Sequence, residues 1–73
     1  TFKPYGKHSS MPHFPKAEEF LTVISGRLKV SSGNRTCILN KGDTGRYRAD
    51  QHHSIENLCG SESSAFLVVW FPK

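Results

Sequence analysis

The apolar residues of this chain recur with a period of two, and this alternation restricts the chain to β-structure. No long stretch repeats apolar side chains at helical spacing. Turn-forming residues interrupt the pattern roughly every 8–12 residues. The pattern predicts about six short strands, at residues 20–25, 27–31, 36–39, 44–48, 53–57 and 65–71. Such a series is typical of an all-β sandwich or barrel.

Two of these strands are predicted to form a hairpin, because residues 27–31 alternate, the turn-forming cluster Ser32-Gly33-Asn34 follows, and residues 36–39 return. Residues 65–71 are apolar on both faces, so we expect this strand to be central or covered on both sides. Residues 1–15 hold several prolines and predict an irregular, extended segment. The large aromatic side chains are expected in the core or at an interface: Phe14, Phe20, Phe66, Trp70 and Phe71.

With 73 residues, the chain is long enough for one domain, residues 1–73, and too short for two. Ten basic and six acidic residues give a net charge of +4. The basic residues are dispersed, which favours a solvated surface over a nucleic-acid-binding one. The apolar run at residues 65–71 is far shorter than the about 20 residues of a membrane helix. The first residues do not form an apolar stretch, so we expect no signal peptide. We therefore expect a cytoplasmic protein with no membrane partner.

The two cysteines, Cys37 and Cys59, fit no metal-binding spacing. We expect them to be reduced and packed as small apolar residues, with a single disulfide between two strands as the alternative.

The first motif surrounds the first strong strand. His13, Glu19 and Gly26 follow one another at a spacing that resembles the first motif of the cupin family, which reads His-x-His, three or four residues, Glu, six residues, Gly. Pro15 stands where the family has its second histidine, and proline cannot coordinate a metal.

The second motif runs from Gly42 to Asn57 and resembles the second cupin motif: Gly, five residues, Pro-x-Gly, two residues, His, three residues, Asn. His53 also falls in register, whereas Arg48 and Asp50 replace the proline and the second glycine. The resemblance implies a small cupin-type double-stranded β-helix, or jelly-roll barrel. Complete cupin domains usually extend further at the N-terminus, so this chain could lack the first strand.

The stretch from Tyr47 to Asn57 is similar to the C-terminal cupin domains of bacterial XRE-type helix-turn-helix regulators. In that group, an N-terminal domain binds DNA and the cupin domain senses a small molecule. The start at Thr1 rather than Met predicts a piece of a longer chain. The resemblance implies that this piece is the sensor part, with DNA as a partner only through the missing N-terminal domain. Cupin domains commonly pair through their sheets, which implies a homodimer.

Three residues with metal-ligand chemistry are His13, Glu19 and His53. In an extended chain, side chains at i, i+2 and i+6 share a face, which places Glu19 on the side of His13. Two imidazoles and one carboxylate can hold a divalent zinc, iron, manganese or nickel ion and leave positions open. The alternative is that Glu19 pairs with a histidine or an arginine inside the barrel. His8 and His52 are expected at the surface.

Arg46 and Arg48 alternate around Tyr47, so the two guanidinium groups share a face. Arginine receives carboxylates bidentately, and the three residues are therefore candidates for ligand binding. The alternative is a solvated strand edge whose charge discourages pairing with another strand.

Three classes of function remain. The leading hypothesis is a sensor domain whose effector, an amino acid or another carboxylate, changes DNA binding by the missing domain. The second is a small metal-dependent cupin enzyme of dioxygenase or isomerase type, with its metal on His13, Glu19 and His53. The third, direct binding of nucleic acid by the β-surface, is supported only by the charge.

Overall fold

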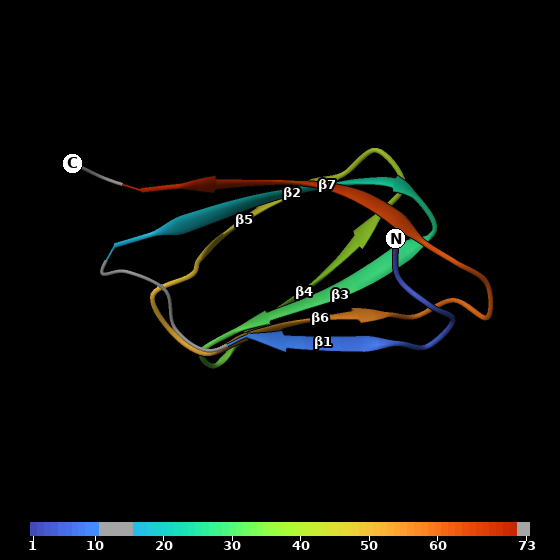
Figure 1. The fold of residues 1–73 in the computed structure, drawn as a ribbon, viewed down its shortest axis with the longest axis horizontal. Helices are drawn as coiled ribbons and strands as arrows, with labels where there is room; N and C mark the ends of the chain where they lie inside the picture. The colour runs from blue at the N-terminus through green and yellow to red at the C-terminus, as the bar shows by residue number, and fades with distance from the viewer. Residues whose placement is uncertain (11–15, 72–73) are drawn as a thin grey trace.

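A computed structural model describes residues 1–10 and 16–71, and these residues form seven strands in two antiparallel sheets (Figure 1). The strands are β1 (Lys7–Ser10), β2 (Glu18–Ser25), β3 (Arg27–Ser32), β4 (Arg35–Asn40), β5 (Thr44–Arg48), β6 (His53–Asn57) and β7 (Ser64–Trp70). One sheet has the order β1-β6-β3-β4 and faces the other, of order β5-β2-β7. The all-β prediction is confirmed. Over the described ranges, no helix is long and apolar enough to span a membrane.

The predicted hairpin is confirmed, because β3 pairs with β4 from Arg27 opposite Asn40 to Ser32 opposite Arg35. β1 lies within the segment expected to be irregular, and that expectation is wrong for residues 7–10. The strand pairs with β6 along its whole length. Its four residues, Lys-His-Ser-Ser, carry no apolar alternation, so the strand depends on backbone pairing with a distant segment that a pattern of side chains does not reveal.

The core lies between the sheets and is built from the inward-facing residues of four strands: Leu21, Val23, Leu28, Val30, Leu39 and Ile55. β2 and β3 alternate between buried and less buried positions, as the sequence predicts. Each such side chain contributes about 1.5–3 kcal/mol when it leaves water. The short inner faces thus supply the main stabilisation of a small domain.

Gly26 links β2 in one sheet to β3 in the other and has a φ of +84°. A Cβ atom at this position would lie 1.9 Å from the Oγ of Ser63, so the backbone conformation and the close approach both require glycine.

Asn57, at the end of β6, is fully buried next to Ser63. Its Nδ2 donates to the carbonyl oxygens of Lys3 and Ser61, both at 2.9 Å, and to that of Phe2 at 3.3 Å. Its Oδ1 accepts hydrogen bonds from the backbone N–H of Cys59 at 2.9 Å and from Ser63 Oγ at 2.7 Å. These residues are called the Asn57 cluster below. The cluster ties the N-terminal segment to the loop before β7, so the second-motif asparagine has a structural role.

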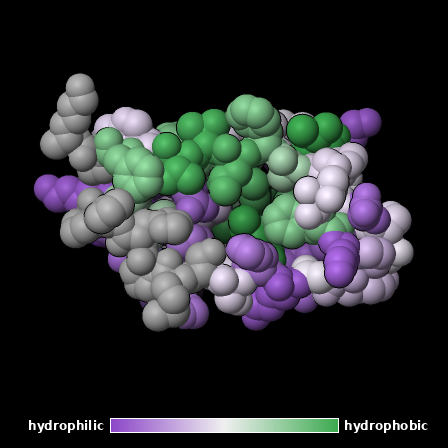
Figure 2. All heavy atoms as spheres, viewed as in Figure 1, coloured by the Kyte–Doolittle hydropathy of each residue, from purple (hydrophilic) through white to green (hydrophobic). Residues whose placement is uncertain are grey.

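β7 lies at the edge of its sheet and pairs with β2 alone among the described strands. The prediction that residues 65–71 would be central or covered on both sides is wrong, because Phe66 is 62% exposed and Trp70 is 50% exposed. Figure 2 shows apolar side chains gathered along the upper edge of the view, where Figure 1 places β7. Apolar residues on both faces predict that other residues pack against both faces of a strand. They do not show which segment provides that packing. The described residues leave this strand uncovered.

Candidate functional site

A buried polar trio lies between the sheets, with Glu19 on β2, Tyr47 on β5 and His53 on β6. The β2–β5 register places Glu19 opposite Tyr47, and the Tyr47 hydroxyl donates to Glu19 Oε1 at 2.5 Å. His53 Nε2 lies 3.4 Å from Glu19 Oε2, and both side chains are almost fully buried. The Tyr47 and His53 rings are 5.8 Å apart between centroids. The predicted alternative for Glu19, pairing with a histidine inside the barrel, describes this arrangement.

Two hydrogens of the trio are placed by its hydrogen bonds, one on His53 Nδ1 and one on the Tyr47 hydroxyl. His53 Nδ1 lies 2.9 Å from the carbonyl oxygen of Gln51, which can only accept, so Nδ1 carries a hydrogen and Nε2 faces Glu19. Burial raises the pKa of Tyr47, and its hydrogen bond to Glu19 and the charge of that carboxylate raise this pKa further. Tyr47 is therefore a hydrogen-bond donor throughout the physiological pH range.

The predicted metal ligands are partly brought together. Glu19 and His53 meet with Nε2 turned toward the carboxylate, and a histidine held through Nδ1 presents this nitrogen to a metal. His13 and Pro15 lie outside the described residues. Within residues 1–10 and 16–71, no three histidine, cysteine, aspartate or glutamate side chains form a metal-binding group. The divalent metal therefore stays a prediction. His8 and His52 are exposed, as predicted.

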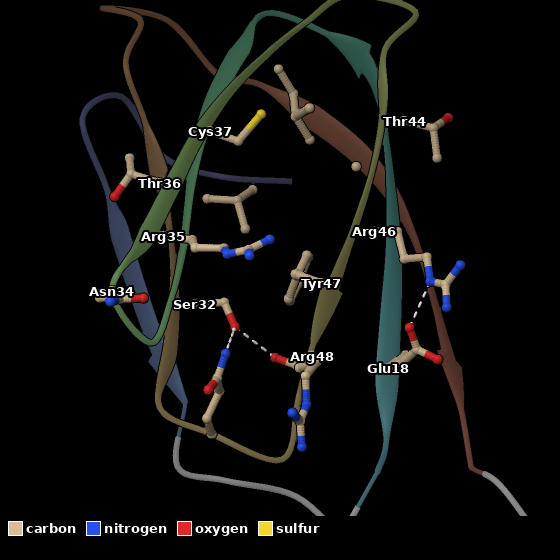
Figure 3. A pocket seen from close by; sticks show the side chains of 14 residues that line it. Glu18, Ser32, Asn34, Arg35, Thr36, Cys37, Thr44, Arg46, Tyr47 and Arg48 are labelled. Carbon is tan, nitrogen blue, oxygen red and sulfur yellow. Dashed lines mark hydrogen bonds and ion pairs between the residues drawn. The ribbon is translucent and has the colours of Figure 1, made fainter.

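A cavity of about 890 Å³ opens between the edge strands β4 and β5 of the two sheets (Figure 3). Val30 and Leu39 contribute apolar surface to it, and Ser32 and Gln51 contribute polar groups. At Gly45 the sheets approach closely, since a Cβ atom there would lie 2.8 Å from Leu39 Cδ1. The lining extends from this contact along β5 to Arg48.

Arg46 and Arg48 lie at the rim of the cavity, with side chains 65% and 64% exposed. Arg46 Nε donates to Glu18 Oε1 at 2.6 Å, and its guanidinium lies 5.8 Å from the centroid of the Phe20 ring. The hydrogen bond to Glu18 raises the pKa of Arg46.

Arg48 is held by Asp50 through two hydrogen bonds, from Nε at 2.9 Å and from Nη2 at 2.5 Å. These bonds raise the pKa of Arg48 and lower the pKa of Asp50. Tyr47 points inward, so the two arginines share the opposite face, as the alternation predicts. Carboxylates of the protein already occupy both guanidinium groups, and their binding of a ligand stays a prediction.

Arg35 also lines the cavity, and the sequence prediction missed it. The strand was predicted to start at residue 36, which left Arg35 in the turn. β4 instead starts at Arg35, so the period of two places its side chain on the inward face with Cys37 and Leu39. Extending the alternation by one residue would have revealed it. Figure 3 shows Arg35 reaching from β4 into the space toward β5.

Both cysteines are free, as predicted. The expectation that both are packed is wrong for Cys37, which is exposed on the cavity wall because it lies on an edge strand. Cys59 is partly buried.

The chain resembles known proteins both in sequence and in fold. The family model described as "Cupin domain" matches residues 1–70. An HTH_3 family transcriptional regulator from Vibrio cholerae aligns with a TM-score of 0.90 and 22% identity, over 97% of this chain and 39% of that protein. The Cupin_2 domain of an XRE family transcriptional regulator from Enterobacter cloacae aligns with a TM-score of 0.89 and 22% identity, over 97% of this chain and 75% of that one.

A protein with a double-stranded β-helix domain from Klebsiella pneumoniae has a TM-score of 0.62 and 25% identity, over 93% of this chain and 56% of that one. The two regulators, at 22% identity, show likeness of fold. This chain spans about two fifths of the Vibrio protein. No curated protein matched the sequence.

Proposed function

Because the chain belongs to the cupin family and has its double-stranded β-helix fold, we propose that it is the small-molecule-sensing domain of a bacterial transcriptional regulator. The observation that carries the proposal is the cavity between β4 and β5, whose volume of about 890 Å³ lies within the usual range of small-molecule sites. The likeness of fold to two regulator proteins supports the regulatory setting. An amino acid or another carboxylate is the proposed effector, and DNA is read by a helix-turn-helix domain elsewhere in the regulator.

A second copy of the chain is the proposed partner, docked on β7. Three aromatic side chains there are each at least half exposed: Phe66, Trp70 and Phe71. Phe66, Val68 and Trp70 share the outward face of β7, whereas Leu67 and Val69 point to the other face, at the open edge of the sheet.

The sheet order supports coupling between the cavity and the proposed interface. β5 lines the cavity and β7 carries the exposed surface, while β2 lies between them and pairs with both. A ligand that shifts β5 therefore acts on β7 through one strand. Such coupling is reciprocal, so an effector that favours the dimer binds the dimer more tightly.

Calorimetric titration of the purified chain with amino acids, other small carboxylates, amines and sugars tests the sensing function. We expect saturable binding of at least one class, with no turnover. Cys37→Phe places a ring in the cavity and should abolish that binding. Ile38→Phe, on the outward face of the same strand, is the matched control and should leave it unchanged. If the folded chain binds none of these compounds, the proposed sensing function is wrong.

Light scattering after size-exclusion chromatography tests the partner. We expect a dimer that Val68→Lys converts to a monomer, because a charge at the centre of the apolar surface cannot be buried without a partner. Thr36→Lys, on exposed β4 in the other sheet, serves as the control. A wild-type chain that remains monomeric at high micromolar concentration would contradict self-association through β7.

A second candidate function is a small metal-dependent enzyme. The orientation of His53 Nε2 toward Glu19 favours it, because both groups are metal ligands and Nδ1 is already fixed by Gln51. A bound metal would supply Lewis-acid or oxygen-activating chemistry, and Tyr47 would orient the carboxylate. Elemental analysis with an activity screen separates the two functions. Stoichiometric metal, with turnover that chelators abolish, would establish the enzyme and displace the sensor.

A further inference from the structure

Arg35 is a charged residue of the cavity lining whose guanidinium does not help to hold the fold together. Among the described residues, its guanidinium takes part in no hydrogen bond or ion pair, and it reaches into the space between β4 and β5 (Figure 3). We infer that Arg35 is the anion-binding residue of this cavity, and that the ligand is a small carboxylate with an apolar body. The inference rests on the proposed sensing function and specifies the residue and the ligand chemistry.

The other charged groups of the cavity lining are already neutralised within the protein. Arg46 bonds to Glu18 and Arg48 bonds to Asp50, each through a hydrogen bond of 2.6 Å or less. In Figure 3, Arg46 and Glu18 lie beyond β5 as seen from Arg35, and the side chain of Arg48 also points away from Arg35. Within the described part of the lining, the unbalanced charge is therefore the positive charge of Arg35.

Two neutral polar residues of the lining, Ser32 and Gln51, are hydrogen-bonded to each other. Ser32 Oγ donates to the carbonyl oxygen of Arg48 at 2.7 Å and accepts from Gln51 Nε2 at 2.9 Å. These bonds hold the wall of the cavity and satisfy Ser32 in both directions. A guanidinium without a partner, beside a wall with satisfied hydroxyl and amide groups, is suited to one anionic group of a ligand.

The side chains that share the inward face of β4 with Arg35 indicate the chemistry of the rest of the ligand. Cys37 and Leu39 follow it on the same face of β4, and Val30 lies beside them on β3. A ligand whose charged end meets Arg35 therefore places its other end on apolar surface. The planar guanidinium matches a carboxylate with two parallel hydrogen bonds. A cation would be repelled, and a neutral amide would lack one of the two acceptors.

Matched acid and amide pairs test this inference on the 73-residue chain. The calorimetric probes are hexanoate with hexanamide, phenylacetate with phenylacetamide, leucine with leucinamide, and inorganic phosphate. We expect at least one acid to bind, and its amide to bind at least about tenfold more weakly. Arg35→Gln should weaken that acid by about 10- to 100-fold and remove the difference between acid and amide.

Two further variants separate charge from geometry. Arg35→Lys keeps the charge and loses the bidentate fork, so its affinity should lie between those of wild type and Arg35→Gln. Arg27→Gln removes a positive charge from the same hairpin at a residue that does not line the cavity, and it should bind as wild type does. Loss of affinity in Arg27→Gln equal to that in Arg35→Gln would reduce the effect to net charge and overturn the inference.

The remaining outcomes distinguish this inference from the proposed function. If acids bind and Arg35→Gln binds them equally well, the residue is wrong and the sensing function stands. If amides or phosphate bind more tightly than the acids, the ligand class is wrong and the sensing function again stands. If neither these probes nor the broader panel bind to the folded chain, the sensing function fails and the inference fails with it.

Discussion

Each end of β6 places a polar side chain between the two sheets, and the two side chains differ in their surroundings. At one end, Asn57 makes five hydrogen bonds within the protein, all of them to the N-terminal segment or the loop before β7. At the other end, His53 faces Glu19, and the cavity nearby holds the unpartnered guanidinium of Arg35. Polar groups that the protein satisfies itself hold the fold, whereas a charge left without a partner is available to a ligand.

The largest expected change in the free energy of unfolding is at the Asn57 end of β6, where the polar groups bond to one another. Asn57→Ala removes all five of these hydrogen bonds. The carbonyl oxygens of Phe2 and Lys3 keep a backbone donor, whereas the backbone N–H of Cys59 and the Ser63 hydroxyl lose the partner that Asn57 Oδ1 supplies. We expect it to lower the free energy of unfolding by about 3 kcal/mol or more, measured by urea denaturation. Asn34→Ala, at an exposed turn, is the control and should change it little. A loss below about 1 kcal/mol at Asn57 would break the comparison, because the cluster would then be dispensable.

Tyr47→Phe probes the trio near the other end. It removes the hydroxyl that donates to Glu19 and leaves a buried carboxylate oxygen without that bond. The expected loss is about 2 kcal/mol, the usual scale for a hydrogen bond to a charged group. Tyr5→Phe controls for the loss of a hydroxyl at a site that is 69% exposed. An equal effect in the two variants would show that the trio adds no stability.

Asp50→Asn gives a smaller effect that depends on pH. The hydrogen bonds from Arg48 and from the Lys16 backbone N–H lower the pKa of Asp50 from its ordinary 3.8. A lowered folded-state pKa adds stability above the unfolded value, and this stability is lost as the pH falls through the folded value. The stability gap between wild type and Asp50→Asn should therefore be full at neutral pH and close below about pH 3.8. Denaturation curves recorded from pH 7 to pH 2 would contradict this if the gap stayed constant.

Arg35→Gln should have the smallest effect on stability. The guanidinium has no partner within the described residues, so its removal should change the free energy of unfolding by less than about 0.5 kcal/mol. Thermal denaturation without ligand measures this change. A loss comparable to that of Tyr47→Phe would place Arg35 among the residues that hold the fold and erase the contrast between the two ends of β6.

Much of the fold follows from the alternation of apolar residues. β3, β5 and β6 lie where the pattern places them, because each presents one face to the core. β1 has no such face, since its polar residues gain their order from backbone bonds to β6. β7 was correctly predicted as a strand but wrongly placed, because apolar character does not distinguish a central strand from an uncovered edge.

The candidate site was less accessible to sequence analysis. The motif spacing brought Glu19 and His53 together correctly, and the alternation placed Arg46 and Arg48 on one face. It did not reveal that Glu18 neutralises Arg46, since that ion pair depends on the register between β2 and β5. Nor did it reveal that Asp50, two residues beyond Arg48 and past the end of β5, neutralises Arg48. Arg35 was missed because its strand begins one residue earlier than the pattern suggests.

The order of strands also determines how the chain reaches its native state. Among the described strands, β3 and β4 are the pair joined by a tight turn, whereas β1 with β6 and β2 with β7 pair across most of the sequence. Closing such long loops costs entropy before the contacts compensate for it, so refolding should take milliseconds to seconds, with the β3–β4 hairpin protected first. Pulsed hydrogen exchange during refolding would show this order, and protection of β2 and β7 ahead of the hairpin would contradict it.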